Sequence, residues 1–131
     1  MHNSLERGGG VRTCLVVDDS RVVRKVSRRI LEEIGFDVAE AADGMEALAW
    51  CRTAMPTAIL LDWNMPVMDG LEFLIQLRRE PGGEAPVVVF CSVENDPDHI
   101  SRALAAGASE YIMKPFDSDI IECKFGEAGL L

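Results

Sequence analysis

Short apolar runs alternate along this chain with longer segments in which apolar residues recur at helical spacing. The short runs are typical of buried strands, and they lie at 14–17, 36–41, 58–61, 87–91 and 110–113. The segments between them predict helices over 20–34, 44–52, 70–79, 97–106 and 118–125. Strands that alternate with helices in this way build an α/β fold, a parallel sheet with helices on both faces.

Cap residues support these boundaries. Gly35 follows the first predicted helix, at the place where a left-handed residue commonly ends a helix. Asp96 and Pro97 supply an N-cap and a first-turn proline for the fourth helix. The apolar residues that share one face of the first helix are Val23, Val26, Ile30 and Ile34.

Polar residues follow or end four of the five predicted strands. Asp18 and Asp19 come directly after the first strand, and Asp62 comes directly after the run 58–61. Ser92 follows the fourth strand and Lys114 the fifth. In parallel sheets of this kind, ligands bind at the carboxyl ends of the strands. The sequence therefore predicts one site that gathers these side chains.

Three carboxylates in one crevice repel each other unless a cation lies between them. Mg²⁺ suits such a site, because it prefers oxygen ligands and commonly uses one or two carboxylates together with a phosphate. Lys114 offsets more of the negative charge, and Ser92 supplies a hydroxyl donor. Phosphoryl transfer needs positioning and charge neutralisation above all. A carboxylate such as Asp62 is already a nucleophile at neutral pH, so no general base is required.

Composition narrows the class of protein. The chain has 131 residues, 48% of them hydrophobic and 27% charged, which is the balance of one globular domain. The net charge of −9 argues against nucleic acid as a partner. No apolar run approaches the ~20 residues that span a bilayer, so we expect a cytoplasmic protein without membrane insertion. Residues 1–10 are expected to be a flexible leader.

The four cysteines show no metal-binding or redox spacing, which favours buried, reduced thiols. They are Cys14, Cys51, Cys91 and Cys123.

Five segments together resemble the CheY-like receiver domains of two-component response regulators. They are 16–20 (VVDDS), 42–48 (ADGMEAL), 60–70 (LLDWNMPVMDG), 106–111 (AGASEY) and 114–116 (KPF). Their order and spacing both match, and the resemblance extends over 11–131. It implies a doubly wound, flavodoxin-like fold with strand order 2-1-3-4-5. Val93 departs from the small residue of many members, and its larger side chain should narrow access to the site.

The resemblance also implies roles for single residues. Asp62 would be the phosphoacceptor, and Asp62 and Asp19 would bind Mg²⁺ through their carboxylates. Asp18 would act largely through water, and Asn64 through its backbone carbonyl. Lys114 would pair with the phosphoryl oxygens.

Two further residues resemble the switch of the family. Ser92 would hydrogen-bond a phosphoryl oxygen in the active state, and Tyr111 would then turn inward. Partners implied in this way are a histidine kinase or histidine phosphotransfer protein, and a downstream target.

Basic residues form a stripe along the first predicted helix: Arg21, Arg24, Lys25, Arg28 and Arg29. This stripe is either a solvated face or a docking surface for an acidic partner. The region is one that kinases and phosphotransfer proteins of the family use, which favours docking.

Alternative functions remain open. An aspartyl-intermediate hydrolase would need an acid two residues after the nucleophile, where this chain has Asn64, so we expect no turnover of an external substrate. A degenerate receiver that only binds is disfavoured by the intact Asp19, Asp62, Ser92 and Lys114. Within the receiver class, chemotaxis through a flagellar-motor protein is the first choice. A phosphorelay shuttle or phosphate sink is the second.

Overall fold

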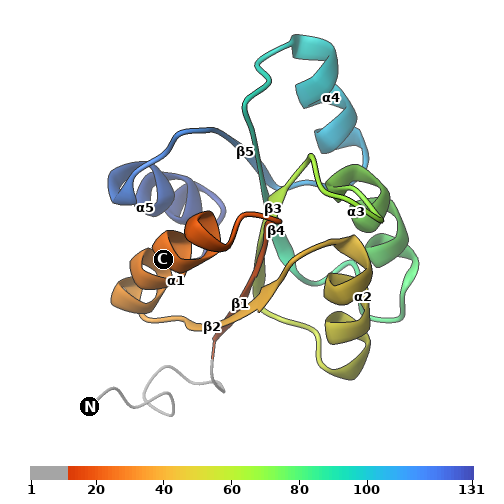
Figure 1. Cartoon of the computed structure of the whole chain (residues 1–131), viewed down its shortest axis with the longest axis horizontal. Helices are drawn as coiled ribbons and strands as arrows, with labels where there is room; N and C mark the ends of the chain where they lie inside the picture. Colours follow the sequence, from red (N-terminus) through yellow and green to blue (C-terminus); the bar gives the residue numbers. More distant parts are fainter. Residues whose placement is uncertain (1–11) are drawn as a thin grey trace.

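The computed structural model describes residues 12–131, and it places five strands in one parallel sheet (Figure 1). The strands are β1 (Thr13–Val17), β2 (Asp37–Ala41), β3 (Ala58–Asp62), β4 (Val87–Ser92) and β5 (Glu110–Met113). The helices are α1 (Arg21–Ile34), α2 (Gly44–Thr53), α3 (Gly70–Arg79), α4 (Pro97–Ala105) and α5 (Ser118–Glu127). The sheet order β2-β1-β3-β4-β5 confirms the predicted fold. The predicted leader, 1–10, lies outside the described residues.

Helices cover both faces of the sheet. Figure 1 shows α1 and α5 on one face, and α2, α3 and α4 on the other. The central strands are therefore buried on both sides, and side chains alternate between two hydrophobic clusters along each strand. In β3, Ile59 and Leu61 face the three-helix layer, whereas Ala58 and Leu60 face the two-helix layer.

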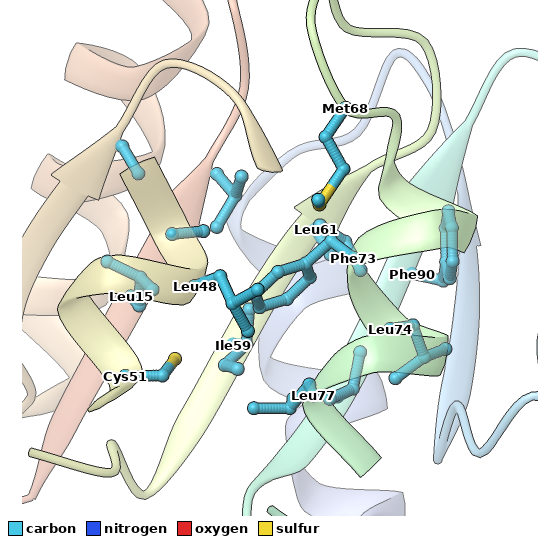
Figure 2. Close-up of a cluster of buried hydrophobic side chains, with 14 of the residues drawn as sticks. Leu15, Leu48, Cys51, Ile59, Leu61, Met68, Phe73, Leu74, Leu77 and Phe90 are labelled. Atoms are coloured by element: carbon cyan, nitrogen blue, oxygen red, sulfur yellow. The ribbon is translucent and has the colours of Figure 1, made fainter. Parts of the chain in front are cut away.

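The larger cluster lies under α2 and α3 (Figure 2). Leu48 of α2 and Phe73 and Leu77 of α3 pack over Ile59 and Leu61 of β3, and all five are at most 2% exposed. Burying a side chain of this size stabilises the fold by about 1.5–3 kcal/mol. This packing holds the β3 strand, and with it Asp62, rigidly against two helices.

Cap residues agree with the predicted boundaries. Gly35 ends α1 in the left-handed region, with φ 115°. Asp96 caps α4 by accepting a hydrogen bond from the Asp98 backbone N–H, and Pro97 occupies the first helical position. Asp69 accepts a hydrogen bond from the Glu72 N–H and so starts α3 directly after the loop that follows Asp62.

The apolar face predicted for α1 is only partly covered by the rest of the fold. Ser27 and Leu31 are the buried residues of this helix, whereas Val26 is 52% exposed and Val22 is 72% exposed. The apolar arc of α1 is wider than the stripe that contacts the sheet. Spacing alone therefore could not show which edge of the arc stays exposed.

Three cysteines are buried and free, as expected, but Cys123 is exposed on α5. Burial raises the pKa of the Cys14 thiol to about 12 and that of Cys51 to about 11. Both thiols therefore stay protonated and unreactive at neutral pH. Within residues 12–131, no helix is long and apolar enough to cross a membrane.

Candidate functional site

Three carboxylates meet at the carboxyl ends of two neighbouring strands, β1 and β3. Val17 of β1 pairs with Leu61 of β3, so Asp18 and Asp62, the residues that follow, are brought side by side. Together with Asp19, each offers a carboxylate oxygen, and these oxygens lie within 4.8 Å of one another. Asp18 and Asp62 are buried, whereas Asp19 is exposed. The predicted cluster of carboxylates is thus present in the structure.

Lys114 lies between two of these carboxylates. Its Nζ is 2.7 Å from Asp18 Oδ2 and 3.0 Å from Asp62 Oδ1, and its backbone N–H donates to the Ser92 carbonyl at 2.9 Å. Burial and the nearby charge of Asp18 raise the pKa of Asp62, and Lys114 opposes them. Burial lowers the pKa of Lys114, but its bonds to Asp18 and Asp62 outweigh that effect and raise it. Lys114 therefore stays charged and partly neutralises the cluster of carboxylates.

The chemistry of the donors fits Mg²⁺. The cluster consists of carboxylate oxygens, without the histidine or thiolate ligands that transition metals favour. One Asp62 oxygen is bonded to Lys114, which leaves its second oxygen for a cation or a phosphoryl group. Asp19, at the solvent side, is open to a hydrated ion.

Two glycines donate backbone hydrogen bonds that fix the loop between β3 and α3. The Gly70 N–H donates to the Trp63 carbonyl at 2.8 Å, which joins the start of α3 to the end of β3. The Gly44 N–H donates to the Met68 carbonyl at 3.0 Å and ties the loop to α2. Asn64, which is exposed, lies within this fixed loop two residues beyond Asp62.

The side chains of Ser92 and Tyr111 both hydrogen-bond the backbone of Glu94. The buried Ser92 Oγ accepts a hydrogen bond from the Glu94 N–H at 3.1 Å, and the Tyr111 hydroxyl donates to the Glu94 carbonyl at 2.9 Å. The Tyr111 ring stacks near Phe90, with centroids 6.2 Å apart. The two predicted switch residues are thus linked through the loop that follows β4.

The predicted basic stripe on α1 is only partly free. Arg24, Lys25 and Arg28 lie against Glu40 of β2, at 3.1, 3.9 and 2.6 Å. Arg21 is exposed at the start of the helix. Glu40 was not among the residues predicted for the site, although a carboxylate in the middle of a strand that follows a basic helix was a visible signal.

The structure also has an apolar groove that the sequence did not predict. It has a volume of about 370 Å³ and lies between α1 and the segment after β5, beside Lys114. It is lined by Val22, Val23, Val26, Ser27, Val93, Lys114, Pro115 and Phe116. Val93, which is 62% exposed, forms part of its rim, so the residue expected to narrow access to the site also builds this groove.

Comparison with known proteins bears on this geometry. The sequence profile of the response regulator receiver domain matches residues 14–124. Response regulator MprA of Mycobacterium avium is 42% identical over 102 residues, which are 78% of this chain and 44% of MprA. The probable transcriptional regulator ycf27 of Porphyridium aerugineum is 36% identical over 110 residues, 84% of this chain and 45% of that protein. The chain spans less than half the length of these relatives.

Solved structures match over nearly the whole chain. The chemotaxis protein CheY4 of Vibrio cholerae superposes with a TM-score of 0.86 at 31% identity, covering 91% of this chain and 99% of CheY4. A CheY-like receiver domain protein of Methanospirillum hungatei has a TM-score of 0.81 at 28% identity, covering 92% and 95%.

Proposed function

The chain belongs to the response regulator receiver family of two-component signalling, and from this premise we propose that Asp62 accepts a phosphoryl group with the help of Mg²⁺. The observation that carries the proposal is the Asp62 carboxylate, buried at the end of β3 between Lys114 and two further carboxylates. Phosphorylation would then change the surface that a downstream partner binds. We take 11–131 as the receiver domain and the cytoplasm as its location.

In the transfer step, an Asp62 carboxylate oxygen attacks phosphorus and forms a P–O bond. The bond to the donor breaks at the same time, and the donor nitrogen of a phosphohistidine leaves with the electron pair. Asp62 loses no proton, because it reacts as the carboxylate. Lys114, 3.0 Å from Asp62 Oδ1, is placed to stabilise charge on the phosphoryl oxygens as it transfers.

Mg²⁺ would be held by the carboxylates of Asp19 and Asp62, by Asp18 through water and by the backbone carbonyl of Asn64. The ion supplies charge neutralisation for the carboxylates and the incoming phosphoryl group.

Acetyl phosphate is expected to label the protein once, at Asp62, and only when a divalent cation is present. Borohydride trapping followed by mass spectrometry places the label. Asp62→Asn should abolish labelling, whereas Asp119→Asn, which changes an exposed aspartate of α5, should label like the wild type. Labelling of Asp62→Asn at the wild-type level would rule out this acceptor.

We place docking of the phosphodonor, a histidine kinase or histidine phosphotransfer protein, on α1 beside the apolar groove. The exposed Val22 and Val26 line this groove together with Lys114, and the exposed Arg21 precedes Val22 at the start of α1. Of the residues predicted from the basic stripe, Lys25 stays accessible for an acidic partner. Arg24 and Arg28 lie against Glu40 and would contribute only at the edge of the docking surface.

Val26→Asp is therefore expected to slow transfer from a protein donor about tenfold, because it puts a charge into an apolar contact worth roughly 1–2 kcal/mol. Labelling by acetyl phosphate, which needs no docking surface, should change far less. Leu104→Asp, which changes another exposed apolar residue, on α4, is the control. It should leave the rates of transfer from the protein donor and from acetyl phosphate unchanged. If the two variants slowed transfer from the protein donor equally, the donor would not dock specifically on α1.

The signal would leave the site through the loop after β4. A phosphoryl group on Asp62 draws the Ser92 hydroxyl, and Ser92 and Tyr111 both hold Glu94. Movement of this loop would shift the population of α4 and β5 arrangements that a partner recognises.

Two outputs have support. A flagellar-motor protein is our first candidate partner, because CheY4 matches this chain over 99% of its own length. A transcriptional output is a further candidate, because ycf27, of which this chain covers 45%, is a probable transcriptional regulator. If the chain is a phosphorelay shuttle or a phosphate sink, its phosphorylated form would bind no motor protein and control no transcription. Measuring whether phosphorylation raises affinity for a motor-switch protein separates the first candidate from the others.

A further inference from the structure

Arg24 of α1 reaches from the start of the helix to the backbone of Asp18, one of the three clustered carboxylate residues. Its Nη1 donates to the backbone carbonyl of Asp18 at 2.7 Å, and its Nε donates to Glu40 Oε1 at 3.1 Å. The Arg24 and Glu40 side chains are only 16% and 17% exposed. The carbonyl of Asp18 belongs to the peptide that joins Asp18 to Asp19. Arg24 therefore hydrogen-bonds the peptide group that joins two of the clustered aspartates.

Glu40 is a firm anchor for Arg24. It lies within β2, where its Cα is paired with that of Val16 in β1, so the sheet fixes its position. Burial raises the pKa of Glu40, but hydrogen bonds from Arg28 and Arg24 outweigh burial and lower it. The carboxylate is thus charged at neutral pH and holds the guanidinium in one orientation.

The other polar atoms of Asp18 are also bonded. Its N–H donates to the Ala41 carbonyl at 3.1 Å, its Oδ1 accepts from the Ser20 N–H at 2.9 Å, and its Oδ2 accepts from Lys114. With Arg24 on the carbonyl, every polar atom of Asp18 has a partner. The turn after β1 is therefore held from α1, β2 and the end of β5 at once.

We propose that Arg24, anchored by Glu40, is a positioning residue for the cation site, which sets the Asp18–Asp19 peptide so that the Asp19 carboxylate points at the ion. The proposal rests on the Mg²⁺ site of the proposed function. Groups that orient metal ligands commonly change metal affinity by about 10–100-fold when they are removed.

The sign of the effect separates positioning from simple electrostatics. Arg24 carries a positive charge close to three carboxylates that would bind a cation. If charge alone mattered, its removal would tighten Mg²⁺ binding. If Arg24 positions the peptide, its removal weakens Mg²⁺ binding despite the lost repulsion.

The experiment is a calorimetric titration of the full chain with MgCl₂. Arg24→Met is expected to weaken Mg²⁺ affinity about tenfold. Arg24→Lys should recover only part of the loss, because a single ammonium cannot bridge the Asp18 carbonyl and Glu40 as a guanidinium does. Arg28→Met is the matched control, since Arg28 also bonds Glu40 but has no bond to Asp18. It should bind Mg²⁺ as tightly as the wild type or more tightly.

Thermal unfolding in EDTA accompanies each titration, so that loss of folded protein is not mistaken for loss of affinity. Glu40→Gln, which keeps Arg24 but weakens its hydrogen bond to residue 40, is expected to reduce Mg²⁺ affinity by less than Arg24→Met does, and it serves where Arg24→Met fails to fold. Wild-type affinity in a folded Arg24→Met, or in Glu40→Gln, would overturn the positioning role. Absence of Mg²⁺ binding in the wild type would instead refute the cation site itself.

Discussion

Gly70→Ala is expected to destabilise the protein by more than about 3 kcal/mol and to abolish labelling of Asp62. A Cβ at this position would overlap the carbonyl oxygen of Asp62 and lie 3.1 Å from the Phe90 ring. Neither backbone can retreat easily, because the Gly70 N–H is bonded to the Trp63 carbonyl and β3 is paired on both sides. Relief of the overlap would move the peptide that carries the phosphoacceptor.

Urea unfolding of the magnesium-free protein gives the change in free energy, and acetyl phosphate labelling reports on the site. Gly126→Ala in α5 is the control, because a Cβ there meets no heavy atom within 4 Å in the described part of the chain. It should stabilise the helix by roughly 0.5–1 kcal/mol and leave labelling unchanged. A Gly70→Ala variant as stable as the wild type would show that the β3–α3 junction has room that the structure does not indicate.

Most of the fold could be predicted from the sequence because its determinants are local. Apolar runs such as 58–61 and 87–91 specify strands that are buried on both faces, and caps such as Gly35 and Asp96 fix helix ends. Once the strands are parallel, the polar residues that end them must meet at one edge. The gathering of Asp18, Asp62 and Lys114 therefore followed from their positions along the chain.

What the sequence left open depends on contacts between distant elements. Whether Val26 is covered depends on how α1 is rotated against the sheet, and the bond from Arg24 to Glu40 depends on the register of β2. Val67 adopts φ 69°, which β-branched residues rarely do. There the tight loop between β3 and α3 overrides the preference of the residue. Exposure of Cys123 likewise follows from the orientation of α5.

Lys114→Met is expected to lower the stability of the magnesium-free protein by about 3 kcal/mol, because it leaves two buried carboxylates without a cation. The Asp18 and Asp62 side chains are 4% and 8% exposed, and Lys114 Nζ bonds both. Methionine preserves most of the apolar stem, so the loss reports on charge. Adding Asp62→Asn should recover much of it, since one of the two repelling charges is then gone. A double variant no more stable than Lys114→Met would mean that repulsion between these carboxylates is not the cause.

Magnesium and pH supply independent checks on this charge balance. Because Mg²⁺ takes over part of the neutralisation, it should raise the unfolding temperature of Lys114→Met by more than that of the wild type. Burial and Asp18 already raise the pKa of Asp62, and loss of Lys114 raises it further. A carboxyl whose folded pKa is raised contributes stability at low pH, and that contribution is lost as the pH rises through the folded value. The deficit of Lys114→Met should therefore be small below about pH 4 and complete at neutral pH. Urea unfolding from pH 3.5 to 7.5 in EDTA measures it, and a deficit that does not depend on pH would assign the loss to packing of the lysine stem.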